Sequence, residues 1–233
     1  MQKLVDDLKI YTMTTEYDFE KKEDIDDTFQ KNGKFYRVNE KDSLFWTLYI
    51  LINGFESYES MLPTSFIREK DEKFKCIEKV RDPYSKTLLK EKQIKNNKNE
   101  IENNLANDEM ITKKTFISLA ILYKVDFLFF ENKKVFRNGM LCRNVGDNPN
   151  MFIIFYDAET KECSMDLAFN KSEIIFLLEK SFHWENIEKP LKAITFYSFD
   201  ELQALSLQLG YKSTEERKDT KKNFYEYISK EIL

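Results

Sequence analysis

The stretch at residues 41–50, KDSLFWTLYI, constrains the fold of this chain more than any other segment. A charged turn is followed at once by a run of large apolar residues, which ends at an Asn-Gly pair. Asp42 or Ser43 is a suitable N-cap, and the run leaves almost no polar face for water. The sequence therefore predicts a central helix that is buried on most sides, with Trp46 and Tyr49 inside.

Composition limits what can surround this helix. The chain has 233 residues, of which 42% are hydrophobic and 15% aromatic, enough for one good-sized domain or for a domain plus a small module. Only 5 Gly and 4 Pro are present, which disfavours a turn-rich sandwich, a phosphate-binding loop and a Gly-x-Ser-x-Gly elbow. The net charge of −4 gives no global attraction to nucleic acid, so binding of that kind needs a local basic patch.

The residues that bind metals are scarce. Cys76, Cys142 and Cys163 are widely spaced without a CxxC pair, and the single histidine cannot complete a zinc set. We therefore expect reduced thiols, no metal and no cofactor. The apolar runs are too short to cross a bilayer and the N-terminus has no signal-peptide core, so we expect no membrane association and no secretion.

The chain divides into three predicted parts. Residues 1–33 form an acidic arm with few apolar anchors, which we expect to become ordered only against a partner. Residues 34–188 form an α+β body. Lys189-Pro190 marks a boundary, and residues 189–233 form a helix-loop-helix module.

Within the body, hydrophobic periodicity predicts the order of the elements. Strands are expected at 34–38, 125–130, 134–137, 151–156 and 163–169, and helices from Thr112 to about 123 and over 172–181. The last two strands are expected to pair as a hairpin.

Residues 57–105 are helical in pattern and highly charged. Phe66, Phe74, Ile77 and Val80 recur at helical spacing, and Pro83 is expected to end or kink this first part. Residues 86–104 then read as one Lys/Glu/Asn helix with sparse apolar positions, which predicts a solvated arm over the core.

Two segments together resemble papain-like cysteine hydrolases, particularly the ovarian-tumour-type deubiquitinases. Residues 40–45, EKDSLF, match that family's acidic turn, nucleophile and Leu-Phe helix start, with Ser43 in the cysteine position. Residues 116–120 followed by 127–130 resemble the family's second helix and core strand. The resemblance implies a papain-like body with a central buried helix and a small sheet. It also implies a degenerate site, because the hairpin expected to carry the histidine has none and because Thr47 stands where similar viral proteins can carry a cysteine.

Catalysis is disfavoured on chemical grounds as well. A thiol or serine hydrolase needs a nucleophile with a base within hydrogen-bond reach, and the only imidazole is His183, between Phe182 and Trp184. We interpret His183 as a packing or helix-end residue and Ser43 as an N-cap, so no catalytic residues are predicted. An active hydrolase that uses Ser43 with His183 is the alternative.

The C-terminal part resembles a SAP-type or LEM-like helical module. Ser198 and Glu201 form a capping-box pattern, and Gly210 stands at a helix C′ position. The residues expected to pack the two helices together are Phe199, Leu202, Leu205, Leu209, Phe224 and Ile228. A candidate phosphate-binding set comprises Lys212, Arg217, Lys218, Lys221 and Lys222. Acidic residues between them make a solvated protein-binding surface an equal interpretation.

The function predicted from these features is a non-catalytic interaction protein of a large DNA virus, such as a virion component, located in the virion or the host cytoplasm. A protein partner is expected, and DNA is a second candidate partner through residues 190–233. The third alternative is a DNA-binding or transcription-associated factor that acts mainly through this module. The Lys/Asn/Ile/Phe bias of the chain is typical of an AT-rich genome.

Overall fold

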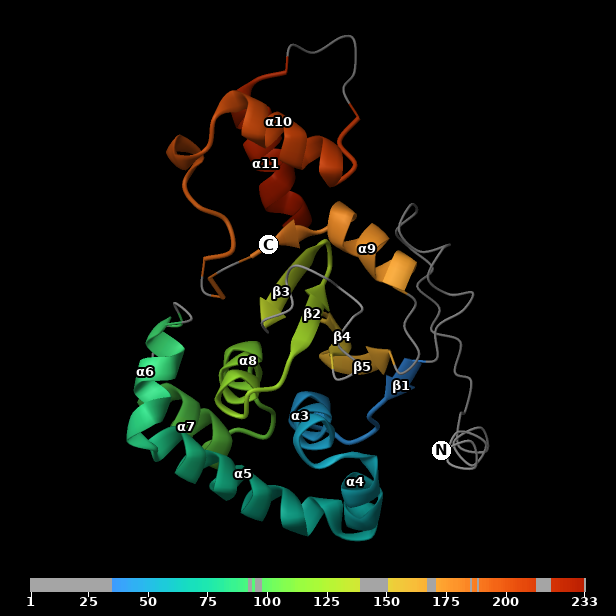
Figure 1. The fold of residues 1–233 in the computed structure, drawn as a ribbon, viewed down its shortest axis with the longest axis vertical. Helices are drawn as coiled ribbons and strands as arrows, with labels where there is room; N and C mark the ends of the chain where they lie inside the picture. Colours follow the sequence, from blue (N-terminus) through green and yellow to red (C-terminus); the bar gives the residue numbers. More distant parts are fainter. Residues whose placement is uncertain are drawn as a thin grey trace.

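The computed structural model describes residues 35–91, 94, 98–138, 151–166, 171–184, 186–187, 189–212 and 219–232. The predicted acidic arm at 1–33 lies outside these residues. Within them the chain is mixed α+β, as predicted (Figure 1). None of the described helices has the length and apolar character needed to cross a membrane.

A six-stranded mixed sheet forms the middle of the molecule. Its strands are β1 (Phe35–Arg37), β2 (Phe127–Glu131), β3 (Lys134–Asn138), β4 (Phe152–Asp157), β5 (Glu162–Asp166) and β6 (Phe182–His183). The spatial order is β1-β5-β4-β2-β3-β6, with β2–β4 and β3–β6 parallel and the remaining pairs antiparallel. The predicted strands and the β4–β5 hairpin are confirmed, whereas the two-residue strand β6 was not predicted.

The sheet is covered on both faces, which explains the continuous apolar sequence of β2. Phe127 and Phe129 point into the larger core, while Leu128 and Phe130 point into a second core on the opposite face. Helix α9 (Lys171–Lys180) covers that second core with its apolar side chains.

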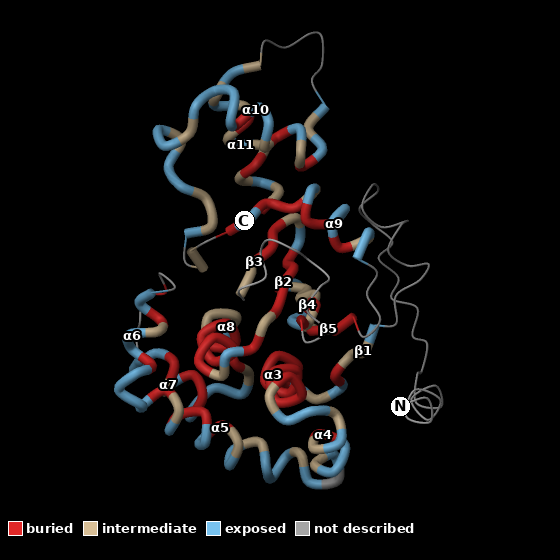
Figure 2. Tube along the Cα trace, in the orientation of Figure 1, coloured by how far each residue is buried: buried red, intermediate tan, exposed pale blue. Residues whose placement is uncertain are grey.

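Helix α3 (Ser43–Asn53) and helix α8 (Lys113–Leu122) lie at the centre of the larger core (Figure 2). Trp46 is fully buried and Tyr49 is 8% exposed, so the predicted central helix is confirmed. Thr112 caps α8 by accepting a hydrogen bond from the Thr115 backbone, also as predicted. The helix that lacks a polar face is therefore the one that the rest of the body surrounds.

Charged helices surround this centre: α4 (Phe55–Met61), the 3₁₀ turn η1 (Leu62–Thr64), α5 (Ser65–Arg81), α6 (Pro83–Glu91) and α7 (Lys98–Asn107). Pro83 separates α5 from α6, as predicted. The expectation of one solvated helix over 86–104 is wrong. Helix α6 ends with a hydrogen bond from the Ile94 backbone N–H to the Leu89 carbonyl, and α7 is a separate helix. The sparse apolar residues of the two helices pack inward, including Leu89 and Ile101, both fully buried.

The C-terminal helices are α10 (Phe199–Gln208) and α11 (Lys221–Ile232), preceded by the 3₁₀ turn η2 (Ile194–Phe196). The capping box of Ser198 and Glu201 is present, and Gly210 follows α10 with a left-handed φ of 95°. The pair packs through buried residues that belong to the same contiguous core as the body, namely Leu202, Leu209, Phe224, Ile228 and Ile232. The division of the chain at residue 189 stays a prediction.

Candidate functional site at the N-terminus of helix α3

The N-terminus of α3 is held by a buried carboxylate. The Asp42 side chain is fully buried and accepts hydrogen bonds from the backbone N–H of Phe45 at 3.1 Å and of Ile111 at 3.0 Å. Asp42 is thus the N-cap, and the interpretation of Ser43 as the cap is wrong. The Asp42 carboxylate has two oxygens and reaches two separate segments, which a serine hydroxyl in the next position cannot do.

A buried lysine neutralises this carboxylate. Lys73 Nζ lies 2.6 Å from Asp42 Oδ2 and 2.8 Å from Glu69 Oε1, and it donates to the Glu109 carbonyl at 3.2 Å. Glu69 in turn accepts a hydrogen bond from Trp46 Nε1 at 3.0 Å. Burial alone would lower the pKa of Lys73, but the carboxylates of Asp42 and Glu69 together outweigh burial and raise it. The network fixes the start of α3 against α5 and against the segment before α8.

Ser43 is the first residue of α3 and is only 4% exposed. Its hydroxyl donates to the backbone carbonyl of Lys161 at 3.0 Å. Lys161 lies in the turn that opens β5 and has a left-handed φ of 60°. The hydroxyl proton of Ser43 is therefore directed at a peptide carbonyl, which is not a base.

Thr47, one turn further along α3, is fully buried against β5. Burial raises the pKa of the Cys163 thiol to about 12, and the Thr47 hydroxyl acts against this shift. Thr47 Oγ1 has no well-formed hydrogen bond to any described residue. A thiol with a raised pKa in a fully buried position is a packing group rather than a nucleophile.

The structure does not bring Ser43 and His183 together. Lys161 precedes β5, whereas His183 is in β6, four strand positions further along the sheet. At the usual spacing between strands, this separation is on the order of 20 Å. His183 Nε2 instead lies 2.5 Å from Arg137 Nη2 on the neighbouring strand β3. The His183 side chain is exposed at the end of β6, yet partial desolvation of its ring and the Arg137 guanidinium lower its pKa to about 4.

The remaining cysteines and the other potential metal ligands form no site in the described residues. Burial raises the pKa of the Cys76 thiol to about 11, and Tyr123 Oη lies 3.9 Å from its sulfur. Cys142 lies outside the described part of the chain. Among the described residues, no group of three or more His, Cys, Asp and Glu side chains could hold a metal ion.

The candidate phosphate-binding set is described only in part. Lys212 and Lys222 are exposed and Lys221 is partly exposed, while Arg217 and Lys218 lie outside the described residues. Lys222 pairs along the helix with Glu226 at 3.6 Å. The first turn of α11 is capped by the Thr220 hydroxyl, which accepts from the Asn223 backbone at 3.3 Å.

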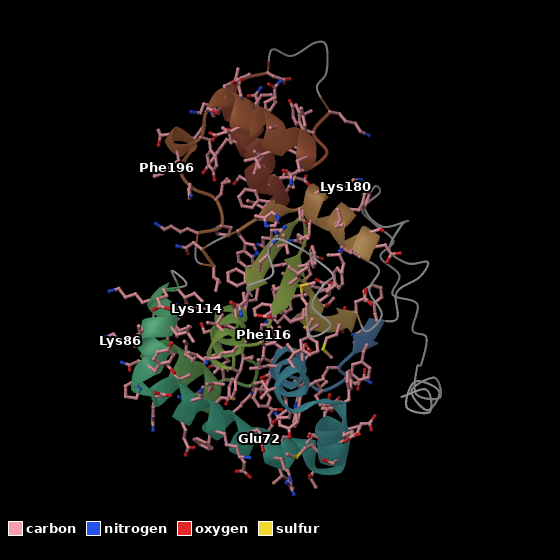
Figure 3. All side chains as sticks on the ribbon, in the orientation of Figure 1. Glu72, Lys86, Lys114, Phe116, Lys180 and Phe196 are labelled. Atoms are coloured by element: carbon pink, nitrogen blue, oxygen red, sulfur yellow. The ribbon has the colours of Figure 1, made fainter. Side chains whose placement is uncertain are left out.

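Two lysines that sequence reasoning missed join the C-terminal pair to the sheet. Lys133 Nζ donates to the Leu209 carbonyl at 2.9 Å and pairs with Glu231 at 2.5 Å. Lys134 is 3% exposed and donates to the Ile232 carbonyl at 2.7 Å. Each lysine thus meets the C-terminal end of one helix, where carbonyls lack intrahelical partners and a cation is favoured. The chain after α9, whose last residue is Lys180 (Figure 3), reaches this joint through the Phe182 backbone N–H, which donates to the Lys133 carbonyl at 2.7 Å.

In comparisons with known proteins, no protein-family model, no curated protein and no solved structure matches the chain.

Proposed function

We propose that this chain is a non-catalytic interaction protein built on a degenerate papain-like hydrolase scaffold. The observation that carries the proposal is the state of Ser43: buried at the start of α3, with its hydroxyl bound to the Lys161 carbonyl. A nucleophile must be reached by substrate and must give its proton to a base, and Ser43 meets neither requirement.

The papain-like body and the SAP-like module are supported by the sequence resemblance and by how the helices and the hairpin are arranged. A buried central helix starts beside the turn that opens β5, and in papain-like hydrolases the histidine belongs near this hairpin. Here that turn carries Lys161, and β5 has no histidine. The capped helices α10 and α11 support a SAP-like module. The resemblance to proteins of large DNA viruses supports a viral protein located in the virion or the host cytoplasm.

The first test is a search for serine reactivity. The full chain is treated with a fluorophosphonate, a small probe that labels activated serines, and with fluorogenic ubiquitin and peptide substrates. We expect no label on Ser43 by intact and peptide mass, and no turnover above buffer. A serine protease in parallel reactions checks the probe, and an active ubiquitin hydrolase checks the ubiquitin substrate. Labelling of Ser43, or turnover that Ser43→Ala abolishes, would overturn the proposal in favour of an active hydrolase.

A second candidate function is DNA binding by the C-terminal pair, favoured by the exposure of Lys212 and Lys222 at one end of the pair. Contacts of this kind would be to phosphate, insensitive to sequence and strongly weakened by salt, since only a handful of cations can act. Fluorescence anisotropy with duplex DNA at low salt tests this function. Charge reversal of Lys218, Lys221 and Lys222 to Glu should abolish such binding. No binding by the unmodified chain, or binding that survives the reversal, would exclude this patch as a DNA site.

A further inference from the structure

A band of large apolar side chains lies exposed along η1 and α5, between Leu62 and Phe74. Leu62 is 44% exposed, Phe66 91%, Ile67 72% and Phe74 55%. Several large apolar side chains exposed on one segment of a monomeric protein often mark a surface that binds something. In Figure 1, α5 runs along the lower edge of the molecule, where a second molecule can reach it.

Phe66 is exposed because α5 is longer than the body beneath it. The C-terminal half of α5 packs on α7 and α8, and it buries Cys76, Ile77 and Val80. Phe66 precedes Ile77 by eleven residues, or three helical turns, and so lies on the same stripe of the helix. Its exposure means that the N-terminal half of α5 extends past the elements that cover this stripe.

The outer face of α5 has a second pattern, which identifies the partner. Ile67, Lys70, Asp71 and Phe74 follow the i, i+3, i+4, i+7 spacing of one helix face, and all four are exposed. Apolar residues stand at both ends of this face, with opposite charges between them. The sequence of the face is therefore complementary to itself when it is read in the reverse direction.

We propose that a second copy of this chain docks on this face, with the two α5 helices antiparallel about a two-fold axis between residues 70 and 71. In this register Ile67 of one copy lies opposite Phe74 of the other, and Lys70 of each copy lies opposite Asp71 of the other. Such an interface is isologous, so every contact occurs twice. A parallel pair would place Lys70 against Lys70, which like-charge repulsion disfavours.

The small size of the band indicates a weak association. One pair of crossed helices buries less than the roughly 1,200 Å² that is typical of stable complexes. The dimer is accordingly weak, with a dissociation constant on the order of micromolar to tens of micromolar.

Sedimentation velocity of the full chain at increasing concentrations tests this inference through charge pairing. The wild type should shift from monomer to dimer as concentration rises. Lys70→Asp and Asp71→Lys should each weaken the dimer by roughly tenfold or more, because each places like charges opposite each other twice. An equimolar mixture of the two variants should restore dimerisation as a heterodimer. The Lys70→Asp/Asp71→Lys double variant should restore it as a homodimer.

Matched controls separate this interface from general effects of charge or folding. Lys86→Asp on α6, whose side chain lies at the outside of the molecule (Figure 3), makes the same charge change and should leave the dimer intact. Ile67→Ser and Phe74→Ser should weaken the dimer, whereas Leu207→Ser on α10, where Leu207 is 55% exposed, should not. Circular dichroism checks that each variant is folded. A chain that is monomeric at all concentrations would overturn the inference, as would a mixture of charge variants that fails to recover the dimer.

Discussion

Lys73 and Lys134 are buried to the same degree, 4% and 3% exposed, but they have opposite electrostatic surroundings. Lys73 has two carboxylates within 3 Å, from Asp42 and Glu69. Lys134 has a peptide carbonyl at 2.7 Å and its nearest carboxylate, that of Glu131, at 3.6 Å. The Lys113 ammonium pairs with the same Glu131 at 2.5 Å and competes for its charge.

The pKa values of the two lysines follow these partners. The pKa of Lys73 lies above its ordinary value, because the carboxylates outweigh burial. The pKa of Lys134 lies below its ordinary value, because burial outweighs the more distant Glu131. The stability of a buried cation is therefore decided by the number and distance of its anionic partners, and not by burial alone. The start of α3 is accordingly a compensated centre for the Lys73 cation, although burial still raises the pKa of the Asp42 carboxyl above its ordinary value. At the joint to the C-terminal pair it is the cation itself, Lys134, that carries the electrostatic cost.

The largest expected effect comes from breaking the compensated centre. Lys73→Met leaves the Asp42 carboxylate buried without its cation and should reduce the free energy of unfolding by about 3–5 kcal/mol. Urea unfolding of the full chain measures this loss. Lys75→Met on the same helix, where the lysine is exposed, is the matched control and should change the stability by less than about 0.5 kcal/mol. Similar small losses for both variants would contradict a structural role for the ion pair.

The joint should be less sensitive to the same substitution. Lys134→Met removes the donor to the Ile232 carbonyl but also an imperfectly compensated buried charge, and Glu131 keeps its pair with Lys113. We expect a loss of about 1–3 kcal/mol, clearly below that of Lys73→Met. Hydrogen exchange should show faster exchange confined to α10 and α11. An equal loss in the two variants would remove the distinction between the two regions.

Raising the pH into the alkaline range should change the stability contributed by Lys73 and by Lys134 in opposite directions. The folded-state pKa of Lys134 lies below the ordinary value of 10.5, so in the range between the two values the unfolded chain binds more protons. Stability contributed through this residue therefore rises as pH rises. The free-energy difference between wild type and Lys134→Met should grow in favour of the wild type as pH rises from neutral towards 10.5. A constant difference would place the pKa of Lys134 at its ordinary value.

The sequence predicts the parts of the fold that depend on local pattern. The helix around Trp46, the strand that includes Phe129 and the capping box at Ser198 were all predicted, because apolar periodicity and cap residues act within a few positions. The separation of α6 from α7 was not predicted. Both segments are rich in Lys, Glu and Asn, and the packing of Leu89 and Ile101 that defines them involves distant parts of the chain.

The candidate site was predicted only at the level of residue types. Sequence reasoning placed Ser43 at the start of α3 but could not show that its hydroxyl meets Lys161, 118 positions away. The sequence does not single out Lys73 or Lys134, since nothing in a lone lysine signals a carboxylate or a helix end across the fold. Phe66 had the spacing of a core residue and is exposed, because the sequence does not show how far α5 extends past its neighbours.

The smallest expected effect concerns His183, whose charged neighbour is the Arg137 cation rather than a carboxylate. The pKa of His183 is about 4 rather than the ordinary 6.5, because its exposed side chain is partly desolvated and lies against the Arg137 guanidinium. Because the folded-state pKa is lowered, the contribution of His183 to stability is present above about pH 6.5. It is lost as pH falls towards 4, where the unfolded chain takes up the proton first.

His183 is the only histidine in the chain, so its ring resonances in an NMR titration report this pKa without an assignment problem. Arg137→Met should move the pKa upward, towards 6.5, and His183→Gln should flatten the dependence of stability on pH between 6.5 and 4. A midpoint near 6.5 in the wild type would mean that Arg137 does not hold the imidazole neutral. The effect of charged neighbours seen at Lys73 and Lys134 would then not extend to His183.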